Sequence, residues 1–343
     1  MMRRFLLFLT FFLVLCGLIS RDTVVRYDTG YPLSLGPDLG GIETRQVFRQ
    51  EIAEARPDVV LLGDSVLRDS VDAKAFSSLA GIPAHRIAQG GSASAFWYLA
   101  LKNSIADASP KPETLVIFFR DTMLTSPGLR VTGDYFAVIN EFAGEEDTLL
   151  VELAYINPMS WLEQAAGRYL PLYGERINLR EILETRLKNT LSGAWLDCRG
   201  ECVQQALDET FAGEKQDAGE ADQAIVRAED YLYRLEELNF ERRLEKSFLP
   251  EILRIAEEAG IHLVFVRTKT WRYPDLEDEP AALQRYHQDL AAYLEENGAV
   301  LIDFSHDPRL ARQLYKDGIH MNADGREVFT RLLAAAFLEQ VIR

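Results

Sequence analysis

The chain has 343 residues, 48% of them hydrophobic, which is enough for one large domain with an insertion or for two domains. Its formal net charge is −16, from 53 acidic and 37 basic residues. No basic stripe is present to neutralise phosphates, so the composition disfavours nucleic acid as a partner and tight docking on anionic lipid. An acidic surface that aids solubility is the simpler interpretation.

Residues 1–20 have the layout of a signal anchor or a signal peptide. Arg3 and Arg4 precede an apolar run at residues 5–19, which is shorter than the roughly 20 residues of a typical spanning helix. No small-x-small cleavage site follows, which favours an uncleaved anchor. Bulky Leu15 stands before Cys16, where a lipoprotein box needs a small residue, so lipidation is less favoured. The rest of the chain is expected outside the cytoplasm.

Residues 21–41 are rich in glycine and proline and predict a linker to a folded body at 42–343. Within that body, Cys198 and Cys202 flank Arg-Gly-Glu. In an oxidising compartment such a pair forms a small disulfide loop, which we favour over two unrelated thiols. A metal site would need two more ligands, and the neighbouring sequence offers no histidine.

The folded body begins and ends with alternating strands and helices. Short, apolar, partly β-branched runs predict buried strands at 58–62, 86–88, 114–119, 261–266 and 299–304. Helical patterns precede, separate and follow them at 42–55, 66–79, 93–105, 250–260, 280–297 and from residue 326. This alternation predicts an α/β fold with a parallel sheet.

Residues 135–246 interrupt the alternation. They show mostly helical periodicity with irregular joints and no convincing buried strand, and the acidic stretch at 213–222 predicts a mobile loop. Two interpretations stay open. The segment is either a helical insertion that covers the edge of an active site or a helical buttress with no contact to substrate.

The first strand stops at Gly63-Asp64-Ser65, which places a serine at the carboxyl edge of the sheet, where open α/β folds bind ligands. A serine hydroxyl needs a base to take its proton. Asp317 and His320 are three residues apart, directly before the terminal helix, a spacing that lets the carboxylate orient the imidazole. His306 also follows a strand and is a rival base, but we expect it to be a loop histidine.

With these residues the chain resembles the SGNH/GDSL hydrolase superfamily. Gly63-Asp64-Ser65 is similar to the first block of that family and Asp317-Gly318-Ile319-His320 to its last, and the resemblance covers residues 57–135 and 248–343. It implies a flavodoxin-like three-layer sandwich with a roughly five-stranded parallel sheet. It also implies Ser65 as the nucleophile, His320 as the general base and Asp317 as its orienting partner.

The family also draws oxyanion donors from a Gly block and an Asn block. Gly90 or Gly91, after the second strand, fits the Gly block. Arg120 stands at the Asn position, and no glycine precedes it. An arginine there brings a fixed charge and a fork of donors. It is expected to stabilise an oxyanion, grip a carboxylate or phosphate of the substrate, or pair with Asp121.

The N-terminal segment, the insertion and Arg120 make the chain resemble the membrane-anchored SGNH-like proteins of alginate O-acetylation and teichoic acid D-alanylation. That branch implies an acyl donor, a glycan acceptor, a membrane-bound O-acyltransferase as partner, and a periplasmic domain tethered to the inner membrane. Ser65 would take the acyl group, and a sugar hydroxyl activated by His320 would remove it. Ester hydrolysis and a non-catalytic glycan-binding accessory protein stay open. No motif indicates a metal or nucleotide cofactor.

Overall fold

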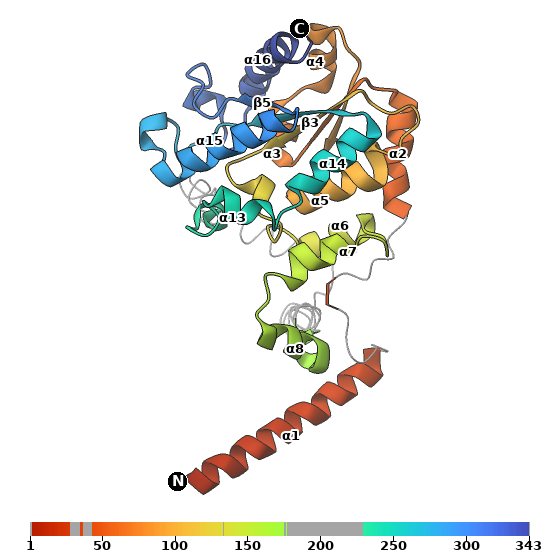
Figure 1. Cartoon of the computed structure of the whole chain (residues 1–343), viewed down its shortest axis with the longest axis vertical. Helices are drawn as coiled ribbons and strands as arrows, with labels where there is room; N and C mark the ends of the chain where they lie inside the picture. Colours follow the sequence, from red (N-terminus) through yellow and green to blue (C-terminus); the bar gives the residue numbers. More distant parts are fainter. Residues whose placement is uncertain are drawn as a thin grey trace, which may run out of the picture. The chain divides into compact units, whose positions relative to one another are not determined.

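The computed structural model describes residues 2–27, 35–36, 43–132, 134–174, 176 and 229–342. The chain divides into two compact units. One comprises residues 1–37 and 155–217, and the larger one comprises residues 38–154 and 218–343. The strands and the residues of the predicted active site all belong to the larger unit (Figure 1).

The larger unit is built on a parallel sheet of five strands. Their order across the sheet is β2 (Ala84–Ala88), β1 (Val59–Gly63), β3 (Thr114–Phe119), β4 (His262–Arg267) and β5 (Val300–Asp303). Strands β1 and β3 are buried along their whole length, which explains their continuous apolar sequences. The order 2-1-3-4-5 is that of flavodoxin-like doubly wound folds, so the predicted sheet is confirmed.

Helices cover both faces of the sheet and make it the middle layer of three (Figure 1). On one face lie α3 (Ser65–Ser70), α4 (Ala73–Ala80) and α16 (Ala323–Gln340), and α16 contacts the other two. On the other face α5 (Ser94–Ala100) packs against α14 (Leu249–Ala259). Helix α2 (Glu43–Ala55) contacts β2, and α15 (Ala281–Glu296) contacts β5.

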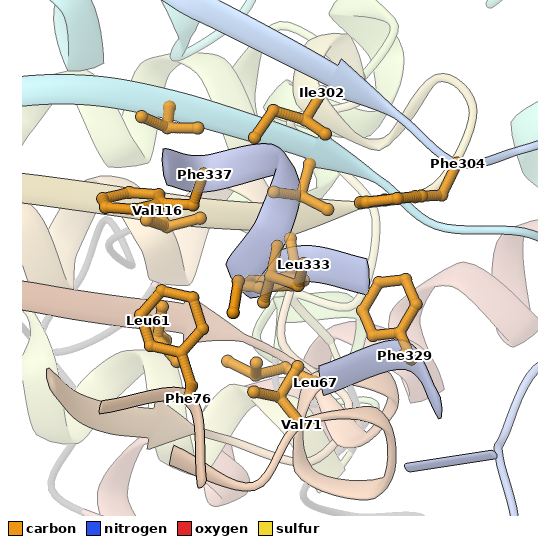
Figure 2. Packing of buried hydrophobic residues seen from close by; sticks show 14 of the residues in the cluster. Leu61, Leu67, Val71, Phe76, Val116, Ile302, Phe304, Phe329, Leu333 and Phe337 are labelled. Carbon is orange, nitrogen blue, oxygen red and sulfur yellow. The ribbon is translucent and has the colours of Figure 1, made fainter. Parts of the chain in front are cut away.

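An apolar cluster joins the sheet to α4 and α16 (Figure 2). Leu61 of β1 and Val116 of β3 face it from the sheet, and both are fully buried. Phe76 of α4 meets Phe337 of α16 edge to face, with ring centroids 5.5 Å apart. This packing fixes α16 on the sheet and thereby fixes the start of that helix, where the loop with His320 ends.

Two predicted helices are interrupted. The helix predicted at 66–79 is split into α3 and α4, because Asp72 accepts hydrogen bonds from the backbone N–H of Lys74 and Ala75 and so starts a new helix. The helix predicted at 93–105 continues from α5 into a π-helical turn, η1 (Leu101–Ile105). There the buried Asn103 side chain donates to the carbonyl of Phe142 at 2.9 Å.

In its described parts, 135–174 and 229–246, the predicted insertion contains helices and turns and no strand of the sheet, as predicted. Its elements are α6 (Asp134–Phe142), α7 (Thr148–Leu150), η3 (Val151–Ile156), α8 (Trp161–Tyr169), α9 (Pro171–Gly174), η4 (Asp230–Tyr233) and α13 (Phe240–Leu244). Short turns η2 (Met123–Thr125), η5 (Leu276–Asp278) and η6 (Arg312–Leu314) complete the described helical elements. Cys198, Cys202 and the stretch 213–222 lie outside the described residues.

The N-terminal segment forms a helix, α1 (Met2–Tyr27), which includes the first part of the predicted linker. Most of the remaining linker lies outside the described residues. Across the residues for which the structure gives positions, no helix combines the length and the apolar character needed to span a bilayer. The membrane anchor at 1–20 is therefore unconfirmed and stays a prediction.

Phe337→Ala is expected to lower the free energy of unfolding by about 3–5 kcal/mol, because it leaves a cavity against Phe76 in a core that cannot close around it. Urea unfolding measures this loss. Arg331→Ala on the same helix, where the side chain is 58% exposed, is the control and should cost about 0.5 kcal/mol or less. Equal losses in the two variants would contradict the assignment of this cluster as the core.

Candidate active site

Ser65 is the first residue of α3, and the turn that carries it follows β1 without a loop. Asp64 caps the helix, and its Oδ1 accepts a hydrogen bond from the backbone N–H of Val66 at 2.9 Å. A Cβ at Gly63 would lie 2.9 Å from Cβ of Leu67 and 3.1 Å from Cβ of Phe118, so this position requires glycine. The turn therefore holds a half-buried serine at the carboxyl edge of the sheet.

His320 lies against Ser65, although the two residues are 255 positions apart in the sequence. Ser65 Oγ is 2.8 Å from His320 Nε2, and His320 Nδ1 is 2.8 Å from Asp317 Oδ2. With the ring proton on Nδ1, the Asp317 carboxylate accepts a hydrogen bond from Nδ1–H, and Nε2 is free to take the proton of the serine. The structure thus brings the three predicted catalytic residues together in one hydrogen-bonded chain.

The carboxylate of Asp317 is also held by its own loop. Its Oδ1 accepts from the backbone N–H of Ile319 at 2.9 Å and of His320 at 2.7 Å. Partial burial acts to raise the pKa of Asp317, but the hydrogen bonds from the His320 ring and from these two N–H groups lower it below its ordinary value. The group stays ionised at neutral pH and can stabilise an imidazolium.

Backbone contacts fix the loop that carries Asp317 and His320. Tyr315 and Met321 form an antiparallel bridge, and the N–H of Trp271 donates to the carbonyl of Gly318 at 2.9 Å. At the start of α16, a Cβ on Gly325 would lie 2.1 Å from the carbonyl oxygen of Leu314, so the helix approaches the loop at a distance that only glycine permits. The position of His320 is thus set by the backbone.

The loop after β2 lies beside the nucleophile turn. The carbonyl of Gly63 accepts from the N–H of Gln89 at 3.0 Å and from Ser92 Oγ at 3.1 Å. Between these residues, Gly91 has φ +72°, and a Cβ there would lie 2.2 Å from the Tyr135 ring. The positive φ and the nearby Tyr135 ring both require glycine at position 91. A Cβ at Gly90 would meet nothing closer than 3.7 Å.

Arg120 is placed differently from the expectation. It is 1% exposed, with Nη1 2.9 Å from Asp64 Oδ2 and Nη2 bound to Glu229 Oε1. These two carboxylates engage its outer nitrogens, which leaves the oxyanion or substrate assignment without support. The predicted pair with Asp121 is wrong, because the Asp121 carboxylate is bound by Arg267 at 3.0 Å and by the Tyr233 hydroxyl.

Arg130 and Glu229 also belong to this group of charged side chains, and the sequence does not predict either of them. Arg130 donates to Asp64 Oδ2 at 3.1 Å and to Glu229 Oε1 at 3.2 Å. Glu229 belongs to the predicted insertion. Neither residue lies in a motif or at the end of a strand, so the sequence carries no signal for them.

His306 and a group of possible metal ligands lie farther along this edge of the sheet. His306 Nε2 lies 3.3 Å from Glu279 Oε2, so this histidine binds the loop that precedes α15, as expected of a loop histidine. Asp121, Glu279 and His287 are buried and offer ligand atoms within 4.8 Å of one another. Arg267 Nη2 binds both of these carboxylates and so holds the position that a cation would take. The expected absence of a cofactor stays an expectation.

No family model and no curated protein matches the chain. Among solved structures it is similar to a protein of Bacteroides fragilis assigned as an acylhydrolase, with 14% identity and a TM-score of 0.40, covering 86% of this chain and 95% of that one. It is also similar to a GDSL-like lipase of Bacteroides thetaiotaomicron, with 13% identity and a TM-score of 0.38, covering 87% and 98%. These scores are too low to carry an argument.

Asp317→Asn tests the electrostatic part of the site. Because the folded pKa of Asp317 is lowered, its ionised form contributes stability above its unfolded pKa of about 3.9, and that contribution is lost as the pH falls through the lower folded value. We expect wild type to be more stable than the variant at about pH 6 and the difference to shrink below about pH 4. Urea unfolding against pH measures this.

Asp289→Asn is the control for this measurement, because Asp289 is exposed on α15. It should produce no comparable pH-dependent change in stability. A difference between wild type and Asp317→Asn that stays constant as the pH falls would contradict the assigned ionisation of Asp317.

Proposed function

We propose that the chain is a serine-dependent enzyme of the SGNH/GDSL type that acts on acyl esters. The observation that carries this proposal is the chain of hydrogen bonds from Ser65 through His320 to Asp317, with both links at 2.8 Å. A nucleophile within reach of a base, and a base oriented by a third group, is the arrangement that activates a serine hydroxyl.

In the proposed mechanism Ser65 Oγ attacks the ester carbonyl while His320 Nε2 takes the hydroxyl proton. The resulting oxyanion is stabilised by backbone N–H groups at the start of α3 and in the loop with Gly90 and Gly91. The tetrahedral intermediate collapses, and His320 returns the proton to the departing alkoxide. An acyl group then remains on Ser65.

The specific proposal for the second half of the reaction is O-acyl transfer to an extracytoplasmic glycan. A sugar hydroxyl would attack the acyl-Ser65 carbonyl while His320 takes its proton. His320 would then return that proton to Ser65 Oγ as the acyl group leaves on the sugar. The N-terminal layout supports this proposal, since Arg3 and Arg4 precede the apolar residues 5–19 as in tethered envelope proteins. A membrane-bound O-acyltransferase partner and a periplasmic location belong to the same proposal.

Ester hydrolysis is the alternative. The side chains of His320 and Asp317 are 17% and 15% exposed, so water reaches the base that would activate it. An enzyme whose deacylation uses water would have the same triad. Transfer and hydrolysis therefore differ in the molecule that accepts the acyl group and share the same triad.

The test is turnover of p-nitrophenyl acetate by the full chain in detergent, with and without an oligosaccharide acceptor. Ser65→Ala and His320→Ala should each lower p-nitrophenol release by about 10³-fold or more. His306→Ala is the matched control, because its ring binds Glu279; it should retain wild-type turnover.

Faster release with acceptor, together with acetylated oligosaccharide, would support transfer. A rate of p-nitrophenol release that is the same with and without acceptor would indicate an esterase. Turnover in wild type no greater than in Ser65→Ala would overturn the enzymatic proposal and favour a glycan-binding accessory protein.

A further inference from the structure

Four charged side chains form a closed group behind the nucleophile turn. Asp64 Oδ2 accepts from Arg120 Nη1 at 2.9 Å and from Arg130 Nη1 at 3.1 Å. Glu229 Oε1 accepts from Nη2 of both arginines, at 3.2 Å for Arg130. Asp64, Arg120, Arg130 and Glu229 are called the charge quartet below. Two positive and two negative groups leave it without net charge.

The charge quartet is removed from water. The side chains of Arg120, Asp64 and Glu229 are 1%, 2% and 7% exposed, and that of Arg130 is 18% exposed. Burial acts to raise the pKa of Asp64, but the charges of Arg120 and Arg130 lower it below its ordinary value. Removing one charge from such a group leaves another buried and uncompensated, which is unfavourable in a low dielectric.

The charge quartet contacts both parts of the proposed reaction site. Asp64 precedes Ser65, and its second oxygen caps α3 through the N–H of Val66. Arg130 also reaches the carbonyl of Ser92 at 3.5 Å, in the loop that follows Gly90 and Gly91. The nucleophile and the glycine loop are therefore tied to the same two arginines.

Glu229 is the member of the charge quartet that comes from the predicted insertion. The segment that follows it is held against the residues after β3, because Thr122 Oγ1 donates to the carbonyl of Leu232 at 2.7 Å. A second contact lies farther on, where Ser126 Oγ donates to Glu237 Oε2 at 2.8 Å. The part of the insertion at 229–237 thus reaches the carboxyl edge of the sheet.

We propose that Glu229 is a positioning residue for Ser65, so that the inserted region completes the nucleophile turn. This inference rests on the proposed function. Glu229 neutralises Arg120 and Arg130 and lets both guanidinium groups hold the single Oδ2 of Asp64. Without its charge, the two guanidinium groups repel each other across one carboxylate and move apart, and Asp64, which is bonded to both, is displaced with them. The cap of α3 and the orientation of Ser65 then loosen.

The test measures the second-order rate at which a fluorophosphonate probe labels Ser65 in the full chain. Glu229→Gln removes the charge and keeps the shape of the side chain. We expect it to label about 10–100-fold more slowly than wild type, the size of effect that a small misplacement of a nucleophile produces. The thermal unfolding midpoint is recorded for each variant.

Glu237→Gln is the matched control. Glu237 is 1% exposed, lies in the same segment and pairs with one arginine, Arg243, at 3.0 Å, but its partners are outside the charge quartet. It should lower the unfolding midpoint as Glu229→Gln does and label within about twofold of wild type. Equal slowing in both variants would show a structural effect only and would overturn the inference.

A charge-balanced double variant separates charge from packing. Arg130→Gln combined with Glu229→Gln leaves Arg120 paired with Asp64 and restores zero net charge. We expect it to recover most of the labelling rate that Glu229→Gln loses. A double variant as slow as the single one would overturn the role assigned to charge.

The outcomes also separate this inference from the proposed function. Wild type that labels no faster than Ser65→Ala would overturn the proposed function and this inference with it. Wild type that labels at Ser65, with Glu229→Gln labelling at the same rate, would overturn this inference alone.

Discussion

The hydrogen bond between Ser65 Oγ and His320 Nε2 depends on two rigid supports that are distant in the sequence. Ser65 is placed by β1 and by the cap at Asp64. His320 is placed by α16, whose apolar side packs on the same sheet through Phe337 and its neighbours. Both ends of the bond are therefore fixed by burial of one core, and the geometry of the site follows from the stability of the fold.

Buried charge is the second constraint at the carboxyl edge. The chain is acidic overall, yet the ends of β3 and β4 carry two arginines, Arg120 and Arg267, each 1–3% exposed and each enclosed by carboxylates. Such groups are costly to bury unless every charge is matched. The carboxylates that pair with these arginines come from separate segments. One of them, Glu229, links the insertion to the end of β3. The proposed role of Glu229 is a consequence of that coupling.

The sequence predicts the parts of the structure that depend on local pattern. The strand at 114–119 has the observed bounds because a buried parallel strand is a continuous apolar run. The proximity of Ser65 to His320 and Asp317 follows from their positions in turns at the ends of a strand and a helix. The break at Asp72 is missed because periodicity continues across it while a cap competes with the helix. The buried pairing of Arg120 is missed because its partner Glu229 meets it only through a tertiary contact.

The most direct test of the proposed mechanism is to trap the acyl intermediate on the nucleophile. The full chain is quenched with acid during turnover of p-nitrophenyl acetate, digested, and analysed by mass spectrometry. The proposed mechanism predicts an acetyl group on the peptide that contains Ser65, absent in Ser65→Ala and strongly reduced in His320→Ala. Turnover that proceeds with the acetyl group on another residue, or with none on Ser65, would contradict it.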